Sequence, residues 1–574
     1  MRQLESNQGG GDHSNRHAWV LLPPQVRANM VISWAARGVL ACLVVAILIA
    51  AFRVFYFSDL NALAASIQDD SFYYLVPAFN VAHGRGFTFG GVPSYGFEPG
   101  YEVVLGLAAF AFQSLHEFFR FSLLLSAIFF AASGVAIYLA TISLARSIDE
   151  RAEVIAWRSI AALGASVVYL SNGWNYFNST TGKENSLSAL LLALSLVSSL
   201  AKRDRGRSGP AIVTGLIAGF LALTRPVPAT LLYIGVLTFV HRRELKKFVM
   251  AASTVIAVWI VFAYVYFGSV VPYSALVKAQ EPSHPVGLKF MMDVCQYVLT
   301  SLQFGVWGPS PVEIPQPNWR DALRPGIGAI FLYSWFAISV LLFARAMWAR
   351  RGLLNRRHIL LPGYFMAMLL GAALMGAAVL LKRPYEEYYA SWYFYDSPVV
   401  VSALMGVGLY LAVPHVARMR RGIPIFLGLA MAAFAFGVSA HYIALRPYSA
   451  NDFVSGIGKR WQNTMIAAGL WYRNHVVDWR RKTVAAGSAG ALDFTLDDRV
   501  INLDGLSNDR AARELLGKGV VTDYLKVARP DYIIDVHDLI FSVAPPNSGV
   551  RLVPVKKFPF LFGGYWVAQT QFTP

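Results

Sequence analysis

Residues 69–101 read DDSFYYLVPAFNVAHGRGFTFGGVPSYGFEPGY and follow the first strongly apolar segment of the chain, residues 39–57. Two adjacent carboxylates, Asp69 and Asp70, come first, and aromatic side chains, a His-Gly-Arg-Gly turn and several Pro and Gly residues follow. The stretch is too polar and too often interrupted to cross a bilayer. It is also too aromatic for a free linker. It predicts a structured loop, residues 58–100, lying on the membrane surface.

The composition around this loop is that of a membrane protein. Of 574 residues, 56% are hydrophobic and 14% are charged, whereas a soluble protein carries about 25% charged residues. Apolar runs long enough for the hydrocarbon core recur along the chain. They lie near 38–57, 101–118, 121–145, 156–171, 185–201, 211–223, 226–240, 248–267, 326–345, 359–381, 396–413 and 423–444. The predicted fold class is therefore an all-α polytopic membrane protein with about 11–12 membrane helices.

The net charge of +17 has a topological explanation. Basic residues gather in loops at 202–207, 241–243, 345–357 and 418–421, as expected for cytoplasmic loops under the positive-inside rule. No aromatic-basic module for nucleic acid is present, so no nucleic-acid partner is expected. The two cysteines, Cys42 and Cys295, exclude a disulfide framework and a metal site built on cysteines.

The loop charges divide the chain into three parts. Residues 1–30 form a polar, cytoplasmic N-terminal tail, residues 31–448 form the membrane domain, and residues 449–574 form an extracytoplasmic α/β domain. In the last part charged residues become frequent, and short strands are expected at 483–487, 500–505, 531–535 and within 552–572, with helices near 507–516 and 520–528. The expected location is the plasma (inner) membrane, multi-pass, with the first loop and the C-terminal domain outside.

One region conflicts with this topology. Between Tyr101, outside, and the loop at 146–158, inside, two apolar segments occur, but parity allows only an odd number of spans. We expect part of 101–118 to pack as a re-entrant or interfacial helix.

Three acids are candidates for the chemistry. Asp69 and Asp70 could cap a helix at the membrane surface, or one could act as a general base whose pKa the other raises. Glu184, in Gly182-Lys183-Glu184 at the start of an apolar helix, could complement the helix dipole or face the same site. The three carboxylates together are an alternative ligand set for a divalent metal.

Two cations are candidates for binding phosphate. Arg225 lies between two short apolar stretches, where a charge needs a partner. It could form a structural ion pair or contact an anionic phosphate through its bidentate fork. Lys278 follows a helix that ends at Gly268, and it could anchor at lipid headgroups or hold a phosphate.

Aromatic residues near the outer surface are candidates for sugar or acceptor contacts. Tyr73 and Tyr74 follow the acidic pair, and Tyr393 lies in an aromatic cluster at 392–395. Interfacial aromatic belts explain most such clusters, but carbohydrate also stacks on aromatic rings. His83 is a further candidate contact, with the alternative of a simple loop residue, and the histidines show no zinc-type spacing.

Taken in order, these residues resemble the GT-C superfamily of membrane glycosyltransferases. The likeness is to bacterial members that use polyprenyl-phosphate sugars, including arabinofuranosyl- and mannosyltransferase relatives. The matching elements are Asp69-Asp70 with the aromatics after it, Asn80, Gly84-Arg85-Gly86, Gly182-Lys183-Glu184, Thr224-Arg225, Phe267-Gly268 with Pro272 and Lys278, and Leu503-Asp504-Gly505-Leu506. The chain departs from the family pattern at Tyr95 and at Val227-Pro228. Because of these departures, the resemblance does not identify the donor or the acceptor.

The resemblance implies transfer of a sugar from a polyprenyl-phosphate donor to an extracytoplasmic glycan, lipid or protein acceptor with inversion. It implies Asp69 as the base, Asp70 and Glu184 as orienting or metal-binding groups, and Arg225 and Lys278 as groups for the donor phosphate. A lipid-linked glycan flippase or transporter and a non-enzymatic envelope assembly protein are the alternatives. A transporter favours ionisable residues inside helices, whereas these acids lie in loops.

Overall fold

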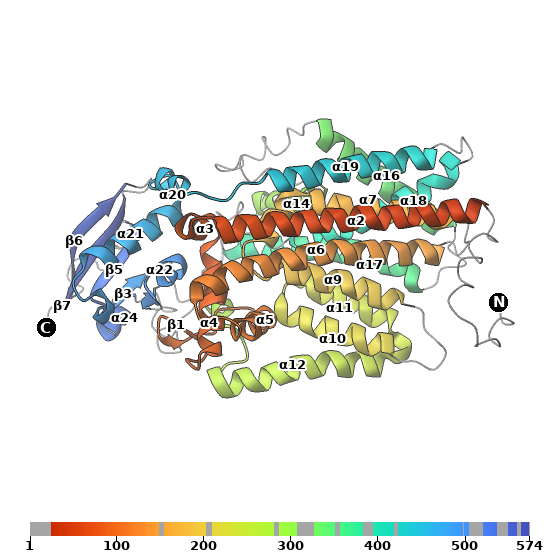
Figure 1. The fold of residues 1–574 in the computed structure, drawn as a ribbon. Coiled ribbons are helices and arrows are strands. Elements are labelled where there is room, and N and C mark those ends of the chain that lie inside the picture. Colours follow the sequence, from red (N-terminus) through yellow and green to blue (C-terminus); the bar gives the residue numbers. More distant parts are fainter. Residues whose placement is uncertain are drawn as a thin grey trace, which may run out of the picture.

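The protein is described here by a computed structural model. It describes residues 24–148, 154–201, 209–280, 286–306, 327–349, 356–382, 394–417, 423–497, 499–503, 521–536, 549–559 and 564–572. A bundle of long helices forms one end of the molecule, and a small α/β domain forms the other (Figure 1).

The bundle confirms the predicted helical membrane domain. Five helices are long and apolar enough to cross a membrane by length and composition among the described residues. They are α2 (Pro24–Phe57), α6 (Leu115–Ile148), α12 (Leu245–Phe267), α17 (Arg356–Lys382) and α19 (Ile423–Ala444). Around them lie α7 (Ile155–Ser171), α8 (Gly173–Ser179), α9 (Asn185–Leu200), α10 (Gly209–Thr224), α11 (Pro228–Val240), α13 (Tyr273–Gln280), α14 (Leu288–Val306), α16 (Ile327–Ala349) and α18 (Ser397–Ala417).

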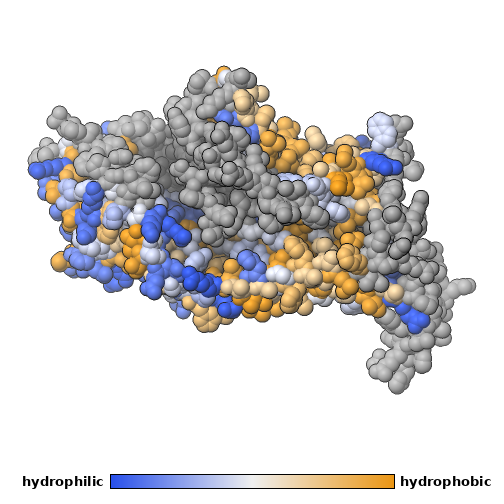
Figure 2. Space-filling model, turned by 90° about the horizontal axis from the view of Figure 1, so that it is seen from above, coloured by the Kyte–Doolittle hydropathy of each residue, from blue (hydrophilic) through white to orange (hydrophobic). Residues whose placement is uncertain are grey.

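The bundle presents apolar side chains on its outside as well as inside. Val265 on α12 is 78% exposed and Phe436 on α19 is 76% exposed. Figure 2 shows hydrophobic residues gathered over the bundle and hydrophilic ones over the end that carries the α/β domain. An outer apolar surface is stable only against lipid, since water would solvate it poorly.

The structure differs from the expected helix limits at two places. Helix α2 begins at Pro24, so the chain is helical before residue 30, where the tail was expected to end. The stretch 268–325, between the predicted membrane helices at 248–267 and 326–345, contains α13 and α14, and α14 packs against α17 and α18. Helix α14 was not predicted because its charged residues interrupt the apolar run.

The region of the parity conflict contains one short and one long helix. Helix α5 (Pro99–Ala109) has 11 residues, which gives a length of about 16 Å, half of the hydrocarbon thickness. The single long helix α6 follows it, so only one element between Tyr101 and residue 148 is long enough to span.

The first loop folds into compact structure. Helix α3 (Leu60–Ser66) begins at Asp59, whose carboxylate accepts the N–H of Ala62 at 3.0 Å. A 3-10 turn, η1 (Asp69–Ser71), leads into α4 (Phe72–Ala82), which is buried along almost its entire length. The antiparallel pair β1 (Thr88–Phe89) and β2 (Val92–Pro93) then returns the chain to α5.

The C-terminal domain is the predicted α/β unit. Its sheet has the order β4-β3-β5-β7-β6. Strands β3 (Val484–Ala486), β4 (Val500–Asn502) and β5 (Tyr532–Val536) are parallel, whereas β7 (Tyr565–Phe572) pairs antiparallel with β5 and with β6 (Val550–Phe558). The helices are α20 (Ala450–Gly456), α21 (Trp461–His475), α22 (Gly490–Thr495) and α24 (Val521–Ala528). The helix expected at 507–516 lies outside the described residues.

The C-terminal domain packs directly on the first loop. Phe494 of α22 lies with its ring centroid 5.0 Å from that of Phe72 on α4 and 5.0 Å from that of Phe119 on α6. The Asp59 N–H donates to the Tyr448 carbonyl at 2.8 Å, at the entry to the domain. Figure 1 shows α22 beside α4, at the junction of the two parts.

Candidate functional site

Asp69 lies at the contact between the first loop and the C-terminal domain. Its Oδ1 accepts the backbone N–H of Ala491 at 2.6 Å, and its Oδ2 accepts that of Gly490 at 3.2 Å. Both donors belong to the start of α22, directly after the loop that follows β3. The carboxylate of the membrane-domain loop is therefore held by backbone groups of the C-terminal domain.

Tyr73 forms a second connection between the same two parts. Its hydroxyl lies one turn after Asp69 and donates to Asp69 Oδ2 at 3.5 Å. The Tyr73 hydroxyl oxygen also accepts the Ala489 N–H at 3.1 Å and an N–H of the Asn502 side-chain amide at 3.0 Å. Because one hydroxyl oxygen can donate once and accept twice, these bonds use its full capacity.

This environment sets the protonation of Asp69. Burial raises the pKa of Asp69 to about 7, the Ala491 and Gly490 amides oppose the rise, and the carboxylates of Asp70 and Asp535 add to it. A hydrogen bond to a carboxylate favours its charged form, whereas burial and a like charge disfavour it. A carboxyl that titrates near neutral pH can take up a proton in a reaction and release it again.

Asp70 faces away from this contact toward the bundle. Its Oδ2 pairs with Lys183 Nζ at 3.1 Å; Lys183 is buried, whereas half of the Asp70 side chain is exposed. Sequence reasoning quoted Lys183 as part of Gly182-Lys183-Glu184 but assigned it no role.

Glu184 and Arg225 form a buried ion pair next to Asp70 and Lys183, and the partly exposed Glu98 lies beside it. Arg225 Nη1 pairs with Glu184 Oε1, and both side chains are almost completely buried. The same Nη1 lies 3.7 Å from Glu98 Oε1, and the Tyr74 hydroxyl donates to Glu98 Oε2. The structural ion pair considered for Arg225 is thus present, with a second acid that sequence reasoning missed, although Glu98 is visible in the opening stretch beside Pro99.

These contacts bring together six of the predicted site residues. Asp69, Asp70, Tyr73 and Tyr74 lie within six residues of chain. Glu184 pairs with Arg225 and lies next to Lys183, the partner of Asp70. In the part of the chain that the structure describes, no three acidic, His or Cys side chains are grouped so that they could hold a metal ion. Asp70 faces Lys183 and Glu184 faces Arg225, so the alternative metal ligand set is not assembled.

His83 lies away from this group of residues. His83 is the exposed C-cap of α4, stacked on Phe79 with a centroid distance of 4.0 Å, at the opposite end of that helix from Asp69. Lys278 lies on α13, and its backbone alone is described. Tyr393 lies outside the described residues.

The Phe267-Gly268 element packs on the return of the first loop. Tyr95 stacks on Phe267 with a centroid distance of 4.5 Å, and its hydroxyl accepts the Trp259 indole N–H at 2.8 Å. The Tyr95 carbonyl accepts the Tyr273 N–H at 2.7 Å, at the start of α13. Tyr95, noted above as a departure from the family pattern, thus links the loop to α12 and to the helix that carries Lys278.

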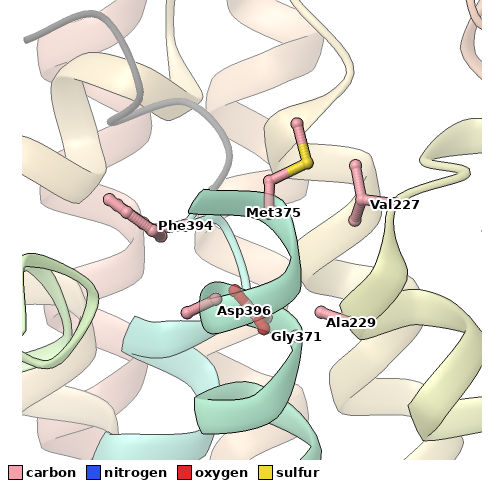
Figure 3. Close-up of a pocket in the computed structure, with 7 residues that line it drawn as sticks. Val227, Ala229, Gly371, Met375, Phe394 and Asp396 are labelled. Carbon is pink, nitrogen blue, oxygen red and sulfur yellow. The ribbon is translucent and has the colours of Figure 1, made fainter. Parts of the chain in front are cut away.

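A small pocket lies beside the segment that follows Arg225. It is lined by Val227, Ala229, Gly371, Ala372, Met375, Phe394 and Asp396. Figure 3 shows Asp396 and Phe394 on one side of α17 and Val227 and Ala229 on the other. The Asp396 carboxylate is buried and accepts the Tyr233 hydroxyl at 2.5 Å. The sequence analysis did not select Asp396.

Comparison with known proteins shows which solved structures share the fold of this chain. A model described as a domain of unknown function (DUF8728) matches residues 454–572. No curated protein matches the sequence. The crystal structure of ArnT from Cupriavidus metallidurans bound to undecaprenyl phosphate superposes with a TM-score of 0.52 at 14% identity, covering 92% of this chain and 97% of that chain. The apo ArnT structure gives a TM-score of 0.45 at 13% identity, with 93% and 98% covered. The chain therefore has the fold of ArnT over nearly its whole length, which confirms the resemblance at the level of fold.

Proposed function

We propose that this protein is a membrane glycosyltransferase that transfers a sugar from a polyprenyl-phosphate donor to an extracytoplasmic glycan, lipid or protein acceptor, with inversion. The observation that carries the proposal is Asp69: a carboxyl with a pKa of about 7, held at the surface of an ArnT-like helical bundle. One ArnT structure has undecaprenyl phosphate bound. A polyprenyl tail would lie in the bilayer and present its sugar beside the first loop.

The chemistry assigned to Asp69 is that of a general base. The acceptor hydroxyl oxygen attacks the anomeric carbon, the bond from that carbon to the phosphate oxygen breaks, and the polyprenyl phosphate leaves with the bonding electrons. Asp69 takes the hydroxyl proton. A base whose pKa lies near the operating pH suits this role, and one displacement inverts the anomeric centre.

The leaving phosphate gathers negative charge, which a cation must stabilise. Arg225 and Lys278 are assigned to it. Arg225 Nη1 faces Glu184 and Glu98, and the planar fork of a guanidinium suits a phosphate group. The two acids would hold the guanidinium in place before the donor binds.

The remaining site residues have supporting roles in the proposal. Asp70 raises the pKa of Asp69 and is itself held by Lys183. Tyr73 and Tyr74 orient carboxylates. The active site and the C-terminal domain lie on the extracytoplasmic side, the side that the basic loops leave for them.

The test is sugar transfer in proteoliposomes that contain the purified full chain and a panel of polyprenyl-phosphate sugars, comparing wild type with Asp69→Asn. We expect one donor to support transfer and the variant to lose about 10²- to 10⁴-fold in rate. Melting curves establish that both proteins are folded. Normal transfer by the variant would remove the base assignment, and a folded wild type that transfers no sugar from any donor would favour a flippase or an assembly role.

A further inference from the structure

The carboxyl-end edge of the parallel strands in the C-terminal domain faces the first loop. Strands β3, β4 and β5 run parallel, so their carboxyl ends meet at one edge. The loop 487–490 follows β3, Asn502 ends β4, and Asp535 lies near the end of β5. In open α/β sheets this edge is where ligands bind.

In this chain the edge holds a side chain of the membrane domain. The Gly490 and Ala491 amides donate to Asp69, while the Ala489 amide and the Asn502 side chain donate to Tyr73. The short run Gly487-Ser488-Ala489-Gly490 is too brief a match for a phosphate-binding loop, yet its last amide, that of Gly490, does donate to the Asp69 carboxyl group.

The position of this loop is itself fixed by buried acids. Asp535 accepts the Gly487 N–H at 2.5 Å, and Asp493 accepts the Val500 N–H at 2.7 Å. Both acids are buried, at 1% and 0% exposure. Because a buried hydrogen-bonded carboxylate is costly to displace, the loop meets Asp69 in one defined position.

There is no spare room at this contact. A Cβ added to Gly490 would overlap the Asp69 backbone carbonyl oxygen and would lie 2.9 Å from Asp69 Oδ1. Position 490 therefore requires glycine, since any side chain would push the Asp69 backbone and carboxylate away from the two amides that hold the carboxylate.

We propose that the C-terminal domain is part of the catalytic site, with Asn502 and the 489–491 amides acting as positioning groups for Asp69. This inference rests on the proposed function. It gives the domain a role in the transfer step itself, because a base that is oriented from outside the membrane domain loses its orientation when that domain moves. Asn502 acts through Tyr73 and touches no substrate.

The experiment measures kcat, KM and the pH profile of Asn502→Ala and Gly490→Ala in the full chain. Losing a hydrogen bond to the Asp69 carboxylate or to its Tyr73 partner disfavours the charged form. The acid limb of kcat should therefore move up by about 0.5 to 1 in pH. At neutral pH kcat should fall about three- to tenfold with little change in KM for the donor.

Matched controls separate positioning from folding. Asn463→Ala removes an equally buried amide that donates to the Phe453 carbonyl within the same domain. Gly456→Ala crowds Asn463, with a Cβ 2.8 Å from its Cγ, as Gly490→Ala crowds Asp69. The controls should lower the melting temperature and leave the acid limb unchanged. An acid limb that stays fixed in the Asn502 and Gly490 variants overturns the inference.

A second measurement does not depend on activity. Hydrogen exchange of the amides at 490 and 491 is compared in wild type, Asp69→Ala and Asp70→Ala. Exchange that accelerates only in Asp69→Ala supports the inference, and exchange that is unchanged overturns it. A wild type that transfers no sugar contradicts the proposed function, and in that case the exchange data still decide whether the domain holds Asp69.

Discussion

The Asp69 carboxylate accepts the Ala491 backbone N–H at 2.6 Å, although 422 residues separate the two along the chain. One partner belongs to a loop at the surface of the helical bundle and the other to a separate α/β domain. This contact links the protonation of Asp69 to the docking of the C-terminal domain. Both properties can be measured.

The pH dependence of transfer should report Asp69. With a pKa of about 7, a base that must be deprotonated gives kcat/KM that rises with pH through about 7 and then levels. In Asp70→Asn the like charge that raises this pKa is absent, so the acid limb should move to lower pH. Transfer rates measured from pH 5 to 9 with saturating and limiting donor check both statements. A limb that moves to higher pH in Asp70→Asn would contradict the assignment.

The stability of the protein should depend on pH through the same group. The folded pKa of Asp69 lies above the value of 3.8 for the free side chain, so the folded state binds the proton more tightly. This contribution to stability is fully present below about 3.8 and is lost as pH rises through about 7. Asp69→Asn, which cannot ionise, should therefore gain melting temperature relative to wild type between pH 5 and 8. Asp523→Asn, at an exposed position of α24, is the control and should show no such trend.

Glu184 and Arg225 should show strong energetic coupling. Both are almost fully buried, so removal of one partner leaves the other charge in a medium of low polarity. Glu184→Gln or Arg225→Met alone should cost about 3 to 5 kcal/mol of unfolding free energy, and the double variant should cost less than the sum. The exposed pair Lys526–Asp523 is the matched control, with an expected coupling of about 0 to 1 kcal/mol. Additive losses at Glu184 and Arg225 would show that the pair is not a unit.

Glu102 should be dispensable for folding. It is completely buried in α5, and among the described residues neither carboxyl oxygen has a hydrogen-bond partner. Burial raises the pKa of Glu102 well above its ordinary value, so burial favours the neutral carboxyl. Glu102→Leu removes the polar atoms at similar volume and should stabilise the protein by about 1 to 3 kcal/mol.

Thermal unfolding in detergent measures this gain. Glu117→Leu, at an exposed position of α6, serves as control and should give no increase in melting temperature. A loss of folded protein in Glu102→Leu, with Glu117→Leu unaffected, would show that Glu102 has a partner that depends on its charge.

Much of the architecture follows from local sequence. The apolar runs predict the membrane helices, because lipid requires a continuous apolar surface and internally satisfied backbone groups. Gly- and Asp-bounded runs of Val and Ile predict strands β3, β4 and β5. Hydropathy does not predict helix α14, because the charged residues within this helix interrupt its apolar pattern and make the segment resemble a loop.

The candidate site divides in the same way. Asp69, Asp70, Glu184 and Arg225 are recognisable from the sequence because ionisable residues beside apolar helices are costly unless they have partners. Which acid meets which cation is not recognisable. Glu98 looks like one more loop acid, yet it shares Arg225 with Glu184, and Lys183 looks like a surface lysine, yet it is buried against Asp70.

By itself, then, the sequence determined the membrane class, the order of helices, the α/β nature of the last domain and the acids of the first loop. All of these depend on composition and on contacts within a few residues. Only the tertiary structure decided that Gly490, Ala491 and Asn502 meet Asp69 and Tyr73. Backbone amides carry no sequence signature, and a hydrogen bond between residues hundreds of positions apart depends on how two domains pack.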